Sequence, residues 1–114
     1  MWEDTYMKEK MMGSYYPKCN STNRSFAKHG DVNGTIRIED GNLYFDAKVL
    51  MMLSSSKNSF MIPLRDIDHV ETMNLNGVMP FGVCLFLKDG TECMLGNMRN
   101  KKLADFINEA IVNY

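Results

Sequence analysis

Residues 35–46 read Thr-Ile-Arg-Ile-Glu-Asp-Gly-Asn-Leu-Tyr-Phe-Asp, and this stretch decides the fold. Apolar and polar side chains alternate on both sides of the central Asp-Gly pair, which is the pattern of two half-buried β-strands. Asp-Gly favours a two-residue type I′ turn, because both central residues of that turn need a positive φ. Such a turn pairs Ile38 with Leu43 and Ile36 with Phe45. All four side chains then share one face of the hairpin, which we expect to be the core face.

A second hairpin is predicted further along the chain, around the turn Lys-Asp-Gly at residues 88–90. Either two or three residues can form its loop. A three-residue loop, with the glycine in the left-handed conformation, sets Val83 opposite Leu95 and Leu85 opposite Cys93. This register gives one consistent apolar face, so we prefer it.

The remaining pattern predicts further short strands and then one helix. Pro63 ends a strand over residues 59–62, because proline cannot donate to a sheet ladder, and another strand is expected over residues 68–75. Asn97 or Asn100 would cap the helix that follows. Its apolar stripe consists of Leu103, Phe106, Ile107, Ala110 and Ile111. We therefore expect a fold that is mainly β with a C-terminal α-helix: a small antiparallel β-barrel or sandwich of about six or seven strands, capped by one amphipathic helix.

Residues 1–25 differ in character from the rest of the chain. Residues 1–12 permit a helix, while residues 13–25 are rich in glycine, serine, asparagine and proline, which favour turns. We expect an N-terminal extension over residues 1–25 and a single domain over residues 26–114. The sequence leaves open whether the extension is docked or frayed.

The composition is that of an ordinary globular domain. The 114 residues are 45% hydrophobic and 24% charged, with a net charge of −1. A nucleic-acid-binding domain would carry a strong basic excess, so no nucleic-acid partner is expected. Neither a secretion signal nor an apolar stretch of about 18 residues is recognisable. These observations predict a cytoplasmic protein that can still sit at the surface of a membrane.

The three cysteines are expected to be reduced thiols, because their number is odd and no CxxC pair occurs. In the preferred register Cys93 lies on the core face and Cys84 on the opposite face, while Cys19, in a loop, is the thiol expected to be exposed. His29 and His69 lie far apart in the sequence and away from the cysteines. We therefore expect no metal site and no cofactor.

Four segments together resemble one known superfold. Gly41–Phe45 looks like a Gly-x-Leu-x-aromatic strand start, and Ile62–Val70 looks like an Ile-Pro-Leu-x-x-Ile-x-x-Val segment. Val83–Leu95 looks like a penultimate hairpin, and residues 100–112 match a closing helix. Over residues 30–112 the chain thus resembles the pleckstrin-homology-like (PH-like) superfold, and within it the GRAM and bacterial PH-like domains. It departs from that family at Asp46–Leu50, where Thr-x-x-Arg-Leu is frequent. The resemblance implies a module that binds rather than catalyses.

A catalytic constellation is not recognisable in the sequence. His29 and His69 are the only candidate imidazole bases, and each is better interpreted as a solvated histidine. The carboxylates of Glu39-Asp40 and of Asp66 with Asp68 suit turns. A small enzyme of unknown type is therefore the least favoured hypothesis. The favoured one is a non-catalytic interaction module that binds a protein or peptide, or a second copy of itself, for example by adding a strand to an open sheet edge.

The alternative is a peripheral module that binds anionic lipids. Some PH domains bind anionic headgroups through cations that converge near the first strands, and Lys28, Arg37 and Lys48 are the candidates here. The apolar loop residues Val78, Met79 and Phe81 would contact the membrane or a partner. The same loop also suits the buried lead-in to a strand.

Overall fold

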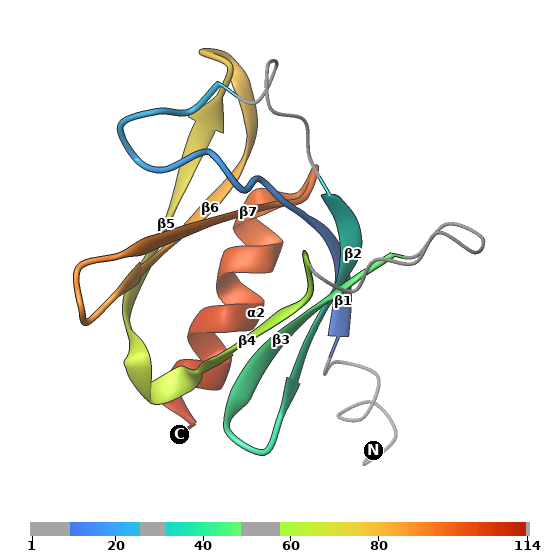
Figure 1. Ribbon diagram of the computed structural model, residues 1–114, viewed down its shortest axis with the longest axis vertical. Helices are drawn as coiled ribbons and strands as arrows, with labels where there is room; N and C mark the ends of the chain where they lie inside the picture. The colour runs from blue at the N-terminus through green and yellow to red at the C-terminus, as the bar shows by residue number, and fades with distance from the viewer. Residues whose placement is uncertain (1–9, 26–31, 49–57, 114) are drawn as a thin grey trace.

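The computed structural model describes residues 10–25, 32–48 and 58–113. Within these residues, seven strands form one antiparallel sheet, which is open, and one α-helix follows the last strand (Figure 1). This confirms the expected fold class of a mainly β protein with a C-terminal helix. The elements are β1 (Lys10–Tyr15), β2 (Val32–Glu39), β3 (Asn42–Ala47), β4 (Phe60–Pro63), the 3₁₀ turn η2 (Leu64–Asp66), β5 (Ile67–Leu75), β6 (Met79–Leu87), β7 (Glu92–Gly96) and α2 (Asn100–Val112).

The strands follow the order β4-β3-β2-β1-β7-β6-β5 across the sheet. Only two residue pairs join β1 to β7, Ser14 with Gly96 and Tyr15 with Leu95. The sheet therefore consists of two halves that meet at this narrow junction, and Figure 1 shows both halves curving around α2. The edge strands β4 and β5 are connected directly by η2.

The strand β1 corrects the expected domain boundary. It lies within residues 1–25, yet it pairs with β2 along its whole length and sits near the centre of the sheet. The boundary expected at residue 26 therefore falls inside the domain. Gly13 was interpreted as a turn residue, but it faces Gly34 across the sheet, and a Cβ at Gly13 would lie 2.5 Å from Cδ1 of Ile36. This glycine serves a close approach between strands and does not end one.

Both predicted hairpins have the expected registers. Ile38 pairs with Leu43 and Ile36 with Phe45 across a turn in which Asp40 and Gly41 have φ values of 53° and 79°. The second hairpin pairs Val83 with Leu95 and Leu85 with Cys93, and Gly90 has a φ of 94°. The length of each loop and its residues with positive φ thus determine the register of each hairpin.

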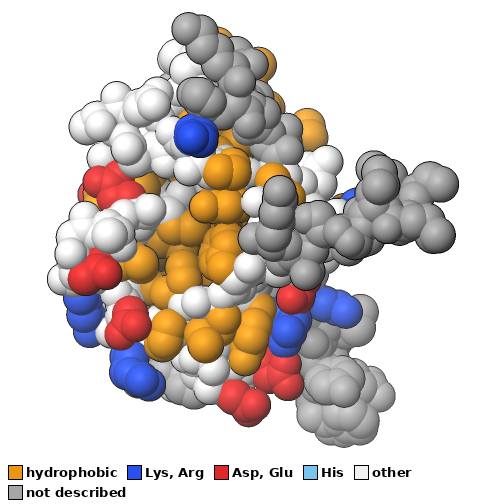
Figure 2. All heavy atoms as spheres, viewed as in Figure 1, with side chains coloured by type: hydrophobic (Ala, Val, Ile, Leu, Met, Phe, Trp, Pro, Cys, Tyr) orange, Lys and Arg blue, Asp and Glu red, His pale blue; other side chains and the backbone are white. Residues whose placement is uncertain are grey.

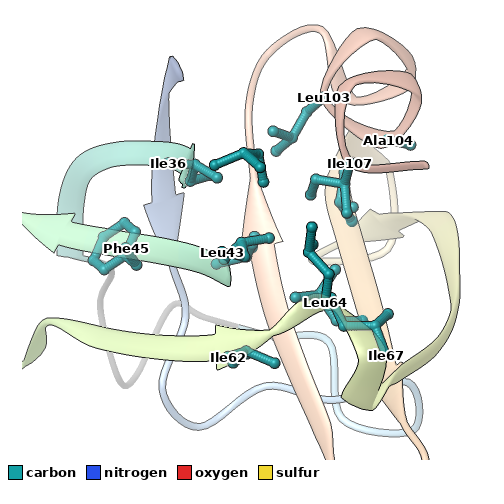
Figure 3. Close-up of a cluster of buried hydrophobic side chains, with 13 residues drawn as sticks. Ile36, Leu43, Phe45, Ile62, Leu64, Ile67, Leu103, Ala104 and Ile107 are labelled. Atoms are coloured by element: carbon teal, nitrogen blue, oxygen red, sulfur yellow. The ribbon is translucent and has the colours of Figure 1, made fainter. Parts of the chain in front are cut away.

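The main core lies between the concave face of the sheet and α2. Its buried members come from both halves of the sheet, from η2 and from the helix. Figure 3 shows Leu103 and Ile107 of α2 pointing toward Leu43, Leu64 and Ile67. Each large apolar side chain buried in this way contributes roughly 1.5–3 kcal/mol. The closing helix is therefore part of the core.

A second, smaller apolar cluster covers the opposite face of β5, β6 and β7. It consists of Tyr16, Cys19, Leu75, Cys84 and Met94. Tyr16 and Cys19 follow β1 directly, so the segment after β1 crosses this face. The expectation that Cys19 is exposed is wrong, because its side chain packs in this cluster and is only 6% exposed. Cys84 lies on the face opposite the core, as expected, and Cys93 packs against the main core.

The helix starts differently from the expectation. Its N-cap is Arg99, whose side chain makes no capping hydrogen bond. Asn97 Oδ1 accepts a hydrogen bond from the Arg99 backbone N–H at 2.7 Å, and this N–H belongs to the N-cap residue itself and not to the first turn of the helix. Asn100 Nδ2 donates to the Gly82 carbonyl oxygen at 3.1 Å. Asn97 therefore holds the segment before the helix and Asn100 holds the first helical residue against β6, and neither caps the helix.

Candidate functional site

Of the three cations proposed for anion binding, the structure describes Arg37 and Lys48, and Arg37 is paired with carboxylates. Arg37 Nε donates to Asp46 Oδ2 at 2.6 Å, and its guanidinium also pairs with Glu39. The guanidinium carbon lies 4.0 Å from the centre of the Tyr44 ring. The hydrogen bond that Arg37 donates to Asp46 raises the pKa of Arg37 above its usual value. Two carboxylates thus already balance this cation. Lys28 lies outside the described residues.

Lys48 lies at the edge of a wide groove of about 610 Å³ on the outer face of β1, β2 and β3. The polar groups of this groove mostly satisfy one another. Ser14 Oγ donates to Asn33 Oδ1 at 3.1 Å, and Asn97 Nδ2 donates to the Met12 carbonyl oxygen at 2.7 Å. Among the described residues that line this groove, Lys48 is the one cation, whereas headgroup recognition needs several converging cations.

The hairpin of β5 and β6 carries the three residues expected in an apolar loop, but Met79 and Phe81 belong to β6 and Val78 alone lies in the turn. Val78 is 78% exposed and Met79 is 38% exposed, so both project from the tip of the hairpin. Phe81 packs against the second cluster. The structure therefore presents two of the three side chains to solvent. Arg24 lies beside this tip, because its carbonyl oxygen accepts a hydrogen bond from the Asn76 backbone N–H at 2.9 Å.

Apolar side chains gather along the middle of the face that Figure 2 shows, and charged side chains lie around them. A small hollow is lined by residues of β1 and β4 and by neighbouring residues. The hollow has a volume of about 260 Å³ and is lined by Tyr15, Pro17, Asn58, Ser59, Phe60, Ile62 and Cys93. Tyr15 and Phe60 make an edge-to-face contact, with ring centroids 4.8 Å apart. Pockets that enclose drug-sized ligands measure roughly 300–1,000 Å³, so this hollow suits no more than a small apolar group.

A groove of about 420 Å³ runs between the edge strand β5 and the helix α2. Val70, Glu71 and Thr72 line it from the strand, and Lys101, Ala104, Asp105 and Asn108 line it from the helix. Among the described residues, β5 pairs with β6 alone, so its other edge lies open beside this groove. On an edge strand, alternate residues direct both N–H and C=O away from the sheet. The groove thus combines side chains with a row of backbone donors and acceptors.

Charged side chains mark the opposite face of β5. The His69 ring stacks on Phe86, with centroids 4.4 Å apart and an angle of 5° between the planes. Its Nδ1 lies 2.7 Å from Asp68 Oδ2, and its Nε2 lies 3.1 Å from Glu71 Oε2. The hydrogen bond to Asp68, followed by that to Glu71, raises the pKa of His69. Consecutive charged residues of this kind are typical of an edge strand that is protected against uncontrolled pairing.

The thiols offer no reactive nucleophile. Burial raises the pKa of Cys84 to about 12, with a smaller contribution from the nearby Glu92 carboxylate. Burial likewise raises the pKa of Cys93 to about 12. A nucleophilic cysteine needs a lowered pKa. In the part of the chain that the structure describes, no group of three or more His, Cys, Asp or Glu side chains is arranged to hold a metal ion.

The comparisons with known proteins identify a fold and no family. The chain matches no protein-family description and no curated protein. It is similar to a solved structure, the C-terminal domain of an unknown protein from Leishmania infantum, with a TM-score of 0.60 and 10% identity. The likeness covers 97% of this chain and 99% of that one, so the shared fold includes the β1 region. At this identity the likeness shows the fold alone.

None of the helices formed by residues 10–25, 32–48 and 58–113 combines the length and the apolar character needed to span a bilayer.

The sequence alone does not reveal the residues of the β5–α2 groove. The strand and the helix were both expected, but their separation in the chain hides the fact that they are neighbours. A signal was present in Asp68, His69 and Glu71, whose charges mark residues 68–75 as an edge strand. Combined with an amphipathic helix that must cover the sheet, this signal indicates where a groove would form.

Proposed function

We propose that this chain is a non-catalytic interaction module of the PH-like kind, which binds an extended peptide by strand addition to β5. The observation that carries the proposal is the open edge of β5 beside a groove lined by both polar and apolar groups. In strand addition, main-chain hydrogen bonds supply affinity and flanking pockets supply selectivity. The order of the strands and the closing helix support the resemblance to GRAM and PH-like domains. A cytoplasmic location belongs to the same proposal.

The two sheet edges differ in how well they suit an added strand. The edge strand β4 has four residues and ends in Pro63, which lacks an N–H donor. In contrast, β5 has nine residues, so it offers room for several hydrogen-bonded pairs. Its register with β6 shifts near Ile67 and near Leu75, which leaves His69 to Met73 as the regular part. Strand addition is therefore proposed along this central stretch of β5.

The experiment is a selection of binders from a displayed library of random peptides, followed by amide hydrogen exchange of the full chain with a selected peptide. We expect slower exchange at alternate amides of β5 and unchanged exchange at β4. Asn108→Trp would fill the groove and abolish binding. Lys102→Trp, on the same helix but outside the groove, is the matched control. A failure to select binders, or protection confined to another surface, would overturn the proposal.

A second candidate, a peripheral membrane-binding module, is favoured by the exposed Val78 and Met79 beside Arg24. An apolar tip next to a cation suits insertion at an anionic interface. Co-sedimentation with vesicles of phosphatidylcholine, with and without phosphatidylserine, tests this candidate. The double variant Val78→Asp, Met79→Asp would lose binding, whereas Val112→Asp, at an exposed site on α2, would not. If the natural chain stays in the supernatant with both kinds of vesicle, this candidate is excluded.

A further inference from the structure

We propose that the β5–α2 groove selects an extended segment that carries two basic residues at alternate positions. This inference rests on the proposed function, because it assumes that the segment lies as an added strand along β5. It goes further by naming the chemistry of the partner.

Two carboxylates on the exposed side of α2 form no ion pair with any residue that the structure describes. Asp105 lines the groove, and Glu109 lines an adjoining hollow that shares Asp105 and Asn108 with it. Neither carboxylate has a hydrogen bond or an ion pair with any residue that the structure describes. The carboxylates of Asp68 and Glu71, by contrast, are engaged with His69. Asp105 and Glu109 are therefore the negative charges available to a partner.

The spacing of these carboxylates matches a strand. Residues four apart in an α-helix are separated by about 6 Å along the axis, at 1.5 Å per residue. Residues two apart in an antiparallel strand are separated by about 6.8 Å and point to the same side. Two basic side chains at alternate positions of an added strand can therefore reach Asp105 and Glu109 together.

The opposite directions of β5 and α2 extend the match between the helix and an added strand to a third residue of the helix. Figure 1 shows α2 running opposite to β5, so a segment antiparallel to β5 runs in the same direction as the helix. Lys101 lies one helical turn before Asp105 and also lines the groove. An acidic residue two positions before the first basic residue would face Lys101. The expected pattern is thus acidic-x-basic-x-basic, read from the N-terminus of the segment.

The same peptide selection tests this inference separately from the proposed function. We expect the selected peptides to be enriched in Lys or Arg at two alternate positions. A synthetic selected peptide should bind the double variant Asp105→Asn, Glu109→Gln about three- to tenfold more weakly than it binds the natural chain. Lys102→Gln, which neutralises a charge outside the groove, should change the affinity less than twofold. A peptide with Glu in place of the first basic residue should regain affinity for Asp105→Lys.

Each outcome separates the two ideas. Selected peptides that protect β5 but carry no pair of basic residues would overturn the inferred preference for basic residues and leave strand addition standing. Selected peptides enriched in acidic residues would likewise overturn only this preference. A failure to select binders would remove both. Sedimentation equilibrium tests whether the chain forms a dimer that the selected peptides dissociate. In that case a second copy of the chain occupies the groove, and the inference of a basic segment as the partner is wrong.

Discussion

Gly34 shows how one missing side chain lets two strands approach each other. A Cβ at this position would lie 2.7 Å from Cζ of Phe45 and would also press on the Asp46 carbonyl oxygen. The Phe45 ring is fully buried, and the carbonyl group belongs to the backbone of β3, so neither can move aside easily. Crowding of this kind in a packed core costs about 1–3 kcal/mol.

We therefore expect Gly34→Ala to lower the free energy of unfolding by about 1–3 kcal/mol, measured by urea denaturation. Asn33→Ala, at the exposed neighbour on the same strand, should change it by about 0.5 kcal/mol or less. Equal effects of the two substitutions would show that the close approach at Gly34 carries no energetic weight.

His69 makes a pH-dependent contribution from an exposed site. Its folded-state pKa is raised by Asp68 and Glu71, so its protonated form is favoured in the folded chain. The stabilisation is fully present below the unfolded pKa of about 6.5 and is lost as the pH rises through the folded pKa. A proton NMR titration should place the folded pKa above 6.5, and Asp68→Asn should move it back toward that value. If the titration midpoint is the same in both chains, Asp68 is not the cause of the shift.

At the scale of elements, α2 holds the fold through a few buried side chains. Ile107 is fully buried in the main core, whereas Val112 on the same helix is 81% exposed. Truncating a buried isoleucine to alanine typically costs about 2–5 kcal/mol, because transfer energy is lost and a cavity remains. Ile107→Ala should therefore lower the free energy of unfolding by this amount, while Val112→Ala should leave it nearly unchanged. Chemical denaturation of both variants checks this, and similar losses would mean that the helix is not docked through Ile107.

The elements that the sequence predicted well are those whose signals are local. Each hairpin register follows from turn residues and alternation within about ten residues of chain, as Asp40-Gly41 and Gly90 illustrate. The strand β1 was missed, because Gly13 and Ser14 resemble turn residues until Gly34 is known to lie opposite. Cys19 was misplaced for a similar reason, since its neighbours in the second cluster are distant in the sequence.

Less of the candidate site than of the strands and the helix could be predicted from the sequence. Val78 lies in the turn before β6, whereas Met79 was expected in the loop and is the first residue of β6. Strand addition to an open edge stays a prediction. Which edge is open, and which helix faces it, depends on the packing of β5 against α2. The engagement of Arg37 by Asp46 depends likewise on the register of β2 with β3, which brings the two side chains together on the outer face.

At the scale of the whole molecule, one core joins both halves of the sheet. The main cluster includes Ile36 and Phe45 from one half, Leu85 and Leu95 from the other, and Ile107 from α2. Neither half can keep its apolar face covered alone, so we expect the chain to unfold in a single cooperative transition.

The three thiols provide a direct measurement of this cooperativity. Cys19 and Cys84 lie in the second cluster, and Cys93 packs against the main core. With a pKa of about 12, a thiol such as Cys84 is ionised to only about one part in ten thousand at pH 8. We expect no rapid reaction with a thiol-specific disulfide reagent in the folded chain and three equivalents on unfolding. All three should appear at one rate. Fast labelling of a single thiol in native buffer would reveal a local opening and contradict the single transition.

The narrow junction between β1 and β7 also orders events during synthesis. Tyr15 is translated about 80 residues before its partner Leu95. At roughly 5–20 residues per second, the ribosome needs about 4–16 s to cover that distance. During this interval β1 can pair with β2 but must wait for its second neighbour, and the apolar surface that α2 will cover stays open to water. The growing chain therefore passes through a period in which it is most exposed to aggregation and to capture by chaperones.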